Sequence, residues 1–494
     1  MNSDIRPNFI AKTLPVDTHL NVSAWQSFRE VIDPLDETLV DQIVYGFTMG
    51  INREHHISIP FTNHRSARVN YSDVDSFVMK HCATGAILGP YDCNPLSVPI
   101  HPSPLQVAVS NSGKHRCVID MSYPPQTSIN SAIPTEWTQV PGFKGEFKLP
   151  THDRICTHVL STPEPHMFVA DLAGYYMQIA SDLSDAPYMC FCWRDKVFIH
   201  RRLPFGCRTA CLQAQRVSNA VAAVHKSRSP GELEPYVDDF DAVCTASLSA
   251  KTYIEFHDLL RILGLLATPE KDIPPTVLAI FCGLEYDLVN YTLTLPEEKT
   301  LRAIAMFESW LQKDECSKQQ LQALLGFLNH ISTVVHAGRA FCASLIDILR
   351  DDQFPHPVSE DLKQDINTWL GFMHTKHSLK SIMKSQDLVT PDTTLAIAVY
   401  QNKAVFRISG HYVGIRVLSH HKLTTPIMFV MALWYICNTY MSHLQNQLIL
   451  ICVPTRAVSA AVNRAKVDAP FARQFLREMW MAQANNDAVV RAVY

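Results

Sequence analysis

The sequence predicts an α+β protein with several domains, and three observations support that prediction. The chain has 494 residues, which at roughly 100 to 200 residues per domain corresponds to about three domains. Apolar residues make up 47% of it and charged residues 18%, so disorder along the whole length is excluded. Between residues 166 and 295, short apolar runs alternate with helical stretches, which is typical of an α+β arrangement.

The segments before and after that stretch differ from it in composition and in the spacing of their apolar residues. Up to about residue 165 the sequence is broken by Pro, Ser and Asn, with strand-like runs at Gln106–Val109 and Arg116–Ile119. An apolar strand is then predicted over Met167–Asp171. From 296 to 350 the apolar spacing predicts helices. The positions expected on their packed faces are Leu301, Ile304, Phe307, Trp310, Leu311, Leu321, Leu324, Leu325 and Leu328.

The last third of the chain is predicted to hold a separate α/β unit. Polar residues and prolines from Asp351 to Pro391 indicate a boundary that contains a short helix. The remainder, 392 to 494, has strand-like runs at Leu395–Tyr400 and Gln447–Cys452, with two helix-like stretches around the latter. The longest apolar run, Ile427 to Cys437, is too short to span a bilayer and is expected to be a buried helix.

The charged residues nearly balance. Lys and Arg number 43 and Asp and Glu number 47, so the formal net charge is −4. This balance does not favour a protein coated with basic side chains, which binds duplexes mainly by neutralising their phosphates. It leaves open a protein whose basic residues line only a cleft.

The 14 cysteines lack the spacing of a disulfide scaffold or of a zinc site. Reduced thiols inside a cell are therefore expected, with cytoplasm and nucleus not distinguished. The first residues have no apolar run behind their charges, so a secretory signal is not expected.

Tyr236-Val-Asp-Asp239 is the sharpest local feature, and Pro235 before it marks a turn. Adjacent carboxylates repel one another, so a strand–turn–strand that presents two in a row is costly unless a cation neutralises them. An ordinary polar hairpin tip is the alternative, because Asp is common in turns.

Asp171 adds an acidic position at the end of the predicted strand. If two strands bring Asp171 and Asp238 to the same edge of a sheet, they build a site of hard oxygen ligands. Such a site suits Mg²⁺, which is bound through one or two carboxylates and substrate phosphates, with Mn²⁺ as a possible substitute. Two such ions activate an attacking hydroxyl and stabilise a leaving pyrophosphate. The pattern therefore points to nucleotidyl transfer.

The order of these motifs resembles motifs A to E of reverse transcriptases. The matching segments are Asp171 with Tyr176 five residues later, Leu203-Pro-Phe-Gly206 with Gln215-Arg216, Tyr236-Val-Asp-Asp239, Lys271, and Phe281-Cys-Gly-Leu-Glu-Tyr286. The closest resemblance is to the polymerase of DIRS-type retrotransposons, which carry a tyrosine recombinase. Further segments look like that family's fingers and thumb: Gly85–Pro90, Lys114–Asp120, Ser128–Asn130, Leu325–His330 and Gly338–Phe341.

The resemblance implies a right-hand polymerase of fingers, palm and thumb, followed by an α/β RNase H-like domain. The domains implied are an N-terminal extension (1–60), fingers and palm (61–295), a helical thumb (296–352), a connection (353–384) and an RNase H-like domain (385–494). The partners implied are an RNA or DNA template, a DNA primer and dNTPs, without a membrane.

The resemblance also implies roles for single residues. Asp171, Asp238 and Asp239 would be the catalytic carboxylates and the ligands of two Mg²⁺ ions. Tyr176 would be the steric gate against a 2′-hydroxyl, with a half-buried core tyrosine as the alternative. The other substrate-binding positions are Arg116 for the triphosphate, Gly206 for close backbone approach, and Lys271 as a proton donor to pyrophosphate. The alternative for Gly206 is an ordinary turn glycine. The alternative for Arg116 and Lys271 is a solvated surface charge.

Several positions depart from the family pattern. The lysine usually found before the fingers turn is replaced by Ser110-Asn111, with Lys114 as a possible substitute, and Tyr175 and Cys211 replace a usual small residue and a usual proline. In the RNase H-like domain the expected acids are missing. Pro391 takes the place of one, with Asp392 one position off, Met428 replaces another, and Val453-Pro454 a third. This domain is therefore predicted to be folded but inactive.

The sequence thus predicts an RNA-directed DNA polymerase of a retroelement. The alternative is a decayed or domesticated reverse-transcriptase-like protein that binds nucleic acid without polymerase activity. The absence of the RNase H acids and of the fingers lysine favours this alternative, whereas the complete set of polymerase aspartates favours the enzyme.

Overall fold

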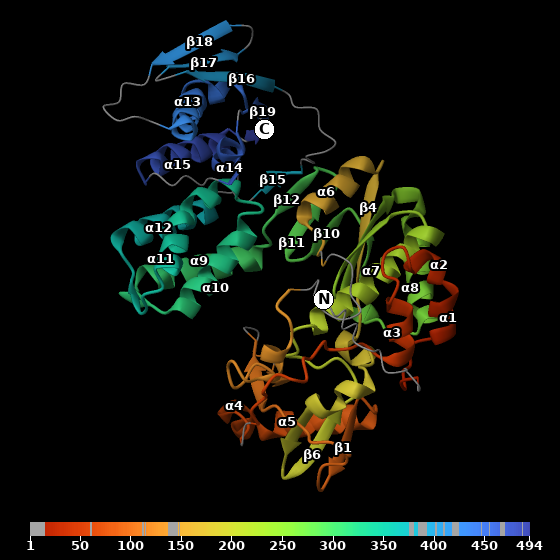
Figure 1. Cartoon of the computed structure of the whole chain (residues 1–494). Helices are drawn as coiled ribbons and strands as arrows, with labels where there is room; N and C mark the ends of the chain where they lie inside the picture. Colours follow the sequence, from red (N-terminus) through yellow and green to blue (C-terminus); the bar gives the residue numbers. More distant parts are fainter. Residues whose placement is uncertain are drawn as a thin grey trace, which may run out of the picture. The chain divides into compact units, whose positions relative to one another are not determined.

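The computed structural model confirms a mixed α+β, multidomain architecture (Figure 1). It describes residues 15–59, 62–110, 113, 115–136, 147, 149–374, 380–383, 393–400, 403–408, 411–416, 424–445, 447–453, 455–464, 470–486 and 488–494. The chain divides into two compact units, residues 1–151 with 162–276, and residues 152–161 with 277–494. Within the described ranges, no helix is both long enough and apolar enough to cross a membrane.

The centre of the first unit is an antiparallel sheet of four strands in the order β7-β8-β4-β9. These strands are β4 (Pro165–Asp171), β7 (Glu232–Tyr236), β8 (Asp239–Thr245) and β9 (Ile273–Thr276). The predicted apolar strand ending at Asp171 is β4. Tyr236 ends β7 and Asp239 begins β8, so the predicted strand–turn–strand around residues 236–239 is confirmed.

Two long helices pack on this sheet, α7 (Ala210–Arg228) and α8 (Ala246–Leu263). Phe168 of β4 and Phe240 of β8 contact Phe256 of α8, with ring centroids 5.7 and 5.3 Å from it. All three rings are fully buried, and burying an aromatic side chain is worth roughly 1.5–3 kcal/mol. The helix α8 ends at Leu263 and is capped by Gly264, which has a left-handed φ of +77°.

The rest of the first unit consists of short helices and smaller sheets. A three-stranded antiparallel sheet has the order β1-β6-β5, and β2 pairs with β3 as a hairpin. The helices are α1 (Val22–Ser27), α2 (Arg29–Ile32), α3 (Leu39–Tyr45), α4 (Arg65–Val69) and α5 (Tyr71–Ala83). The strands are β1 (Ile87–Tyr91), β2 (Leu105–Val109), β3 (His115–Ile119), β5 (Cys190–Trp193) and β6 (Lys196–His200). The two predicted strand-like runs are thus β2 and β3.

The second unit begins with α6 (His152–Ser161) and continues with a sheet and a helical region. The sheet has the order β10-β11-β12-β15, made of β10 (Leu278–Phe281), β11 (Leu284–Asp287), β12 (Thr292–Thr294) and β15 (Lys380–Ile382). The helices are α9 (Glu297–Leu311), α10 (Lys318–Ile331), α11 (Ala343–Asp351) and α12 (Glu360–His374), with β13 (Glu315–Cys316) paired to β14 (His356–Pro357).

The predicted helices between 296 and 350 are present, but one position on their packed face is wrong. Leu301 is 60% exposed, and the buried residues of α9 are Ala303, Phe307 and Trp310. These three lie four and three residues apart, on one side of the helix, and Leu301 falls outside that stripe. The helix expected to be short, α12, has 15 residues and buries Trp369 completely.

The end of the chain combines strands and helices, as predicted, with a mixed sheet in the order β18-β17-β16-β19-β20. It is not a compact unit of its own in the division above, because it belongs to the second unit. Its strands are β16 (Thr393–Tyr400), β17 (Lys403–Ile408), β18 (His411–Arg416), β19 (Leu448–Cys452) and β20 (Val489–Val493). Its helices are α13 (Thr425–Tyr440), α14 (Arg456–Arg464) and α15 (Pro470–Asn485). The apolar run from Ile427 to Cys437 lies within α13, and most of it is buried, as expected. The partly exposed positions of the run are Ile427, Met431, Trp434 and Tyr435.

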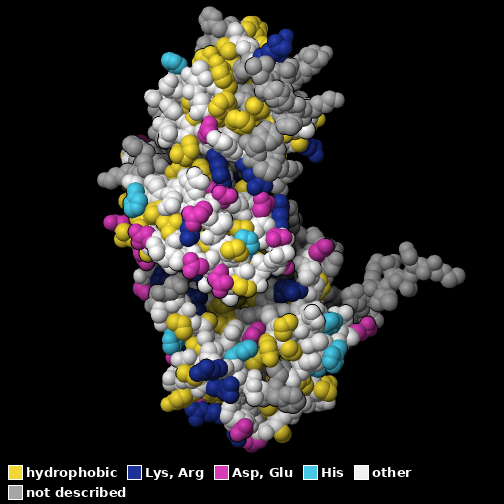
Figure 2. All heavy atoms as spheres, turned by 90° about the vertical axis from the view of Figure 1, so that its left-hand side faces the viewer, with side chains coloured by type: hydrophobic (Ala, Val, Ile, Leu, Met, Phe, Trp, Pro, Cys, Tyr) yellow, Lys and Arg dark blue, Asp and Glu magenta, His cyan; other side chains and the backbone are white. Residues whose placement is uncertain are grey.

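Acidic and basic side chains are mixed on part of the face that Figure 2 draws, most densely across its middle. That picture agrees with the nearly balanced composition.

Candidate active site

The three predicted carboxylates meet at one end of the β4–β8 pair. Asp171 is the last residue of β4 and Asp239 the first of β8, and the two are direct cross-strand partners. The backbone N–H of Leu172 donates to the carbonyl of Asp238 at 2.9 Å, which ties the segment after β4 to the turn before β8. The antiparallel register therefore places Asp171, Asp238 and Asp239 at the same edge of the sheet.

The turn that presents Asp238 and Asp239 is held in an unusual backbone conformation. Val237 has a φ of +57°, which is rare and costly for a β-branched residue. Helix α7 fixes this residue from both sides. Gln215 Oε1 accepts from the Val237 N–H at 2.8 Å, and the Ser218 hydroxyl donates to the Val237 carbonyl. Strain held in this way by surrounding contacts is typical of functional sites.

The segment from Thr268 to Asp272 contacts both the backbone and the side chain of Asp171. The Thr268 N–H donates to the Asp171 carbonyl at 2.8 Å, and Asp272 Oδ1 accepts from the Asp171 N–H at 3.3 Å. Lys271 Nζ lies 2.6 Å from Asp171 Oδ1, with the lysine side chain 60% exposed and the carboxylate 14% exposed. Lys271 is thus brought to the carboxylates.

Asp272 is fixed from behind by helix α8. Its side chain is 1% exposed, and Asp272 Oδ2 lies 3.0 Å from the Tyr253 hydroxyl, which donates to it, and 2.9 Å from His257 Nε2. The sequence alone does not single out Asp272, Tyr253 or His257. The only local signal is that Asp272 directly follows Lys271.

The charges at this edge are incompletely balanced. Burial raises the pKa of Asp239 to about 6, and the neighbouring carboxylates of Asp238 and Asp171 contribute to this rise, while Lys271 opposes it. The pKa of Asp238 is also raised, first by burial and then by the charge of Asp171, while Lys271 and Arg116 lower it. A cation bound here would relieve the repulsion.

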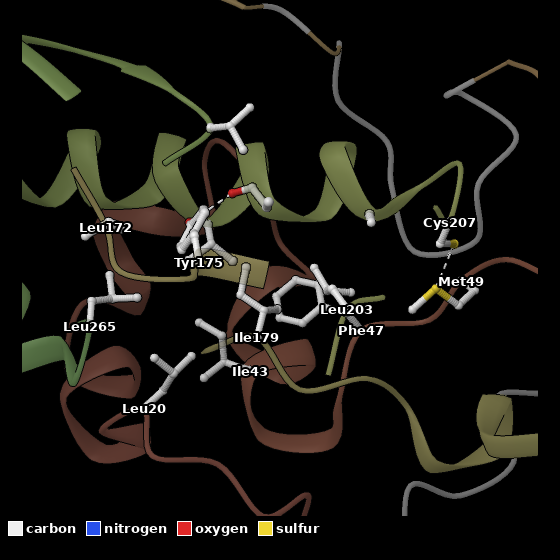
Figure 3. Close-up of a cluster of buried hydrophobic side chains, with 14 of the residues drawn as sticks. Leu20, Ile43, Phe47, Met49, Leu172, Tyr175, Ile179, Leu203, Cys207 and Leu265 are labelled. Carbon is white, nitrogen blue, oxygen red and sulfur yellow. Dashed lines mark hydrogen bonds between the residues drawn. The ribbon is translucent and has the colours of Figure 1, made fainter. Parts of the chain in front are cut away.

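Tyr175 and Tyr176 follow Asp171 in a short 3-10 turn (Tyr175–Gln178) and point to different surroundings. Tyr175 is buried within the hydrophobic cluster drawn in Figure 3. Its hydroxyl contacts Ser218 Oγ at 2.8 Å and donates to the Ala214 carbonyl at 3.0 Å. These contacts anchor the Tyr175 side chain to α7.

Tyr176 is half-buried beside the carboxylates. Its ring meets the ring of Phe205 edge to face, with centroids 4.7 Å apart. Burial raises the pKa of its hydroxyl, with further contributions from Cys211 and from the charge of Asp238. Tyr176, the predicted gate, therefore lies near Asp238, a predicted metal ligand, and its ring packs against the ring of Phe205.

Gly206 lies against the β2–β3 hairpin, and its backbone needs glycine. Its φ is +106°, and a Cβ atom there would lie 2.0 Å from the Ile119 carbonyl oxygen. The Asn130 side chain donates to the Gly206 carbonyl at 2.7 Å and accepts from the Arg208 N–H at 2.8 Å. The close backbone approach predicted for Gly206 is thus made to a protein strand.

Arg116 lies on β3 with an exposed side chain, and its charge reaches Asp238. All seven predicted site residues belong to the first unit, and direct contacts or electrostatic interactions link six of them: Asp171, Asp238, Asp239, Lys271, Arg116 and Tyr176. Lys114, the substitute considered for the missing fingers lysine, lies outside the described residues, as does Asn111, which stands with Ser110 where that lysine is expected.

The carboxylates fit Mg²⁺ only in its open mode of binding. In the part of the chain that the structure describes, no group of three or more His, Cys, Asp or Glu side chains forms a metal cage. Mg²⁺ does not need one, because it is usually held by one or two carboxylates together with substrate phosphates and water. Asp171 and Asp239, which are cross-strand partners, are the two carboxylates that such a mode of binding would use.

Comparison with known proteins supports the fold. No protein-family model and no curated protein matches the sequence. Among solved structures, the foamy viral protease-reverse transcriptase dRH in complex with double-stranded DNA is similar with a TM-score of 0.56. The identity is 11%, over 97% of this chain and 83% of that chain.

Two further foamy viral protease-reverse transcriptase structures are similar with a TM-score of 0.51. One, in complex with an RNA/DNA hybrid, is 12% identical over 90% of this chain and 56% of that chain. The other, in complex with double-stranded DNA, is 13% identical over 97% of this chain and 99% of that chain. At such identities the likeness concerns the fold, and this chain has a reverse-transcriptase-like fold.

Proposed function

We propose that the chain is an RNA-directed DNA polymerase whose catalytic centre is formed by Asp171, Asp238 and Asp239. The observation that carries this proposal is the cross-strand pairing of Asp171 with Asp239 beside a strained turn that presents Asp238. A fold that needed only a polar hairpin tip would gain nothing from three mutually repelling carboxylates at one edge. The likeness of the fold to proteins in complex with DNA and with an RNA/DNA hybrid supports nucleic-acid partners.

The finer assignments extend this proposal. The family is the DIRS type, with fingers and palm over 61–295, a thumb over 296–352 and an RNase H-like domain over 385–494. The motif order and the helices between Glu297 and Asp351 support this arrangement. The substrates are dNTPs, a DNA primer and an RNA or DNA template.

In the proposed reaction the primer 3′-hydroxyl attacks the α-phosphate of a dNTP, and pyrophosphate leaves. Asp171, Asp238 and Asp239 would hold Mg²⁺ together with substrate phosphates, and the ion would supply charge stabilisation at the transferred phosphate. Arg116, exposed on β3, pairs with triphosphate oxygens through its planar guanidinium. Lys271 holds a proton within reach of the leaving group. Tyr176 excludes a 2′-hydroxyl through its ring, which Phe205 supports.

Primer extension by the purified chain tests the proposal. Asp238→Asn keeps the size of the side chain and removes its charge, so we expect extension to fall by about 1,000-fold or more, as is typical when a centre of electrostatic catalysis is disabled. Asp258→Asn is the matched control, because Asp258 is an exposed aspartate of α8 with a side chain 55% exposed. A near-normal rate for Asp238→Asn would refute the assignment.

A decayed, purely nucleic-acid-binding protein is the second candidate. The pairing of Lys271 with Asp171 favours it, because that ion pair occupies a carboxylate oxygen that a metal would use. Extension on an RNA template in Mg²⁺ and then in Mn²⁺ separates the two candidates. Binding of primer–template without product in either metal supports the binding protein.

We also propose that the RNase H-like domain is inactive. Met428, aligned with an expected acid, is 1% exposed in α13, and Val453, aligned with another, is 6% exposed. Pro391, Asp392 and Pro454 lie outside the described residues. Incubation of the full chain with a labelled RNA–DNA hybrid tests this proposal, and Mg²⁺-dependent cutting of the RNA strand would overturn it.

A further inference from the structure

One long segment near the end of the chain lacks acidic residues. From Thr393 to Val467 the sequence contains no Asp or Glu, whereas seven Lys or Arg fall in the same stretch. The whole chain has a formal net charge of −4, so this segment departs strongly from its average. It includes β16, β17, β18 and β19 of the five-stranded sheet.

The sheet buries one face and exposes the other. The helices α13, α14 and α15 lie on one side of it, as Figure 1 shows. The side chains buried on that side include Ala404 and Phe406 of β17. The alternate positions of β17, Lys403, Val405 and Arg407, are exposed. A side-chain period of two places these three on the opposite face of the sheet.

The exposed face continues onto the neighbouring strand. In the antiparallel register, Lys403 is opposite Arg416, Val405 opposite Gly414, and Arg407 opposite Tyr412. We name these six residues of β17 and β18 the basic sheet face. Three of them are cations and none is acidic. A Cβ atom built on Gly414 would meet no heavy atom within 4 Å, so the face is open at its middle.

Two features of this face are unfavourable for a sheet that serves only as structure. Lys403 and Arg416 are like charges placed directly across two strands, an arrangement that destabilises a sheet. Tyr412 is 74% exposed, and the guanidinium of Arg407 lies 5.7 Å from its ring centroid. An anion beside the cations and a flat apolar group on the ring would turn both features into favourable contacts.

We propose that the basic sheet face binds single-stranded nucleic acid. Phosphates of the strand pair with Lys403, Arg407 and Arg416, and a base stacks on Tyr412. The two cross-strand pairs that carry these cations are four residues apart, or about 13 Å at about 3.3 Å per residue, so one strand of a few nucleotides reaches both. An aromatic ring and cations on an open sheet suit a single strand, because its unpaired bases are free to stack.

This surface is separate from the proposed polymerase centre, since it belongs to the other compact unit. It needs no catalysis, so the proposal stands or falls independently of polymerase activity. A second copy of the chain or another protein segment is a different occupant, and the charge of the face argues against both, since each would have to bring acidic groups.

Fluorescence anisotropy with the full chain tests the proposal. The probe is a labelled single-stranded oligo(U) or oligo(dT) of about 15 nucleotides, a length within the site sizes of single-strand binding surfaces. Excess unlabelled primer–template hairpin is added to occupy any polymerase cleft. Arg416→Glu is the central variant, because the new carboxylate faces Lys403 and replaces the like-charge pair by an ion pair. We expect it to preserve or raise Tm while weakening binding of the probe about tenfold or more.

The salt dependence separates charge from stacking. The binding constant K falls as salt is added, and a plot of log K against log salt concentration is linear. On a single strand, each phosphate that the protein neutralises adds about 0.7 to the magnitude of this slope. Arg416→Glu should therefore reduce this slope by about 0.7 or more. Tyr412→Ala should weaken binding about fivefold or more with an unchanged slope. Arg456→Glu on α14 is the matched control, an exposed cation of the same segment, and should bind as the unaltered chain does.

Two outcomes would overturn the proposal. One is probe binding by Arg416→Glu and Tyr412→Ala equal to that of the unaltered chain. The other is a concentration-dependent dimer, seen by light scattering, that these variants abolish while probe binding persists, which would assign the face to a second copy. Loss of primer extension in Asp238→Asn with intact probe binding supports this proposal as a function separate from the polymerase.

Discussion

Lys271 Nζ lies 2.6 Å from Asp171 Oδ1, so the proposed proton donor is paired with a proposed metal ligand. The contact raises the pKa of Lys271, first through the hydrogen bond to Asp171 and further through the charges of Asp238 and Asp239. In the absence of a metal, this lysine partly neutralises the carboxylates. The same ammonium group competes with any cation for Asp171 Oδ1.

Lys271→Met should therefore lower two quantities for different reasons. Removing the ammonium leaves more negative charge at the site, so the Mg²⁺ concentration that gives half-maximal extension should fall. The maximal rate should fall as well, by roughly 10²–10⁴-fold if the lysine donates a proton in the reaction. Mg²⁺ titrations of primer extension measure both.

Lys251→Met is the control, because Lys251 is an exposed lysine of α8 paired with Glu255. It should leave both quantities unchanged. An unaltered rate in Lys271→Met would remove the lysine from the proposed mechanism.

Asp239→Asn should stabilise the metal-free protein at neutral pH. The pKa of Asp239 in the folded chain is about 6, above its ordinary 3.8, because of burial and the neighbouring carboxylates. A raised pKa means that the folded state binds the proton more tightly than the unfolded state. The free energy of unfolding should therefore rise as pH falls from about 6 to about 4.

Thermal melts in EDTA between about pH 7.5 and 4.5 check this prediction, since the window spans most of the interval between the folded and unfolded pKa values. As pH falls across that window, the Tm of the unaltered chain should rise relative to the Tm of Asp239→Asn, because the variant carries no titratable group at position 239. At neutral pH the variant should melt a few degrees higher, since about 1 kcal/mol corresponds to about 2–4 °C in a unit of this size. Parallel pH profiles for the two proteins would contradict the raised pKa.

The strands that carry the candidate site could be predicted from the sequence. The hydrogen bonds that hold its residues in place could not. The carboxylates at 171, 238 and 239 lie beside apolar runs, so local sequence indicates that they end or begin strands. The hydrogen bond from the Asp171 N–H to Asp272 joins residues 101 positions apart, and no local pattern encodes it. Leu301 was misplaced for a related reason, because a helical period does not determine which of two overlapping stripes meets the neighbouring helix.

Asp272 should act by positioning Asp171. Its carboxylate accepts from the Asp171 N–H and contacts Tyr253 and His257, so its oxygens are already engaged by protein groups. Asp272→Ala removes all three contacts, and we expect activity or Mg²⁺ affinity to fall about 10- to 100-fold, as for other groups that orient metal ligands.

Asp272→Asn retains an oxygen that accepts from the Asp171 N–H and should recover much of that activity. A merely structural role would lower Tm in both variants without changing the Mg²⁺ concentration for half-maximal rate. The Mg²⁺ titration, measured beside the melting temperature, therefore distinguishes positioning from general stability.

Tyr176 should select against ribonucleotides. Its ring is half-buried next to Asp238 and is supported edge-on by Phe205. Tyr176→Val removes the ring and opens space for a 2′-hydroxyl. We expect incorporation of rNTPs relative to dNTPs to rise about tenfold or more, while the rate with dNTPs changes less.

Phe205→Leu provides an intermediate case, because it removes the edge-to-face contact and leaves Tyr176 in place. It should relax discrimination by a smaller factor, since an unsupported ring blocks the same space less rigidly. Single-nucleotide incorporation with matched rNTP and dNTP pairs measures the ratio of kcat/KM values. If Tyr176→Val keeps the full discrimination, the ring at 176 is a packing residue and the gate lies elsewhere.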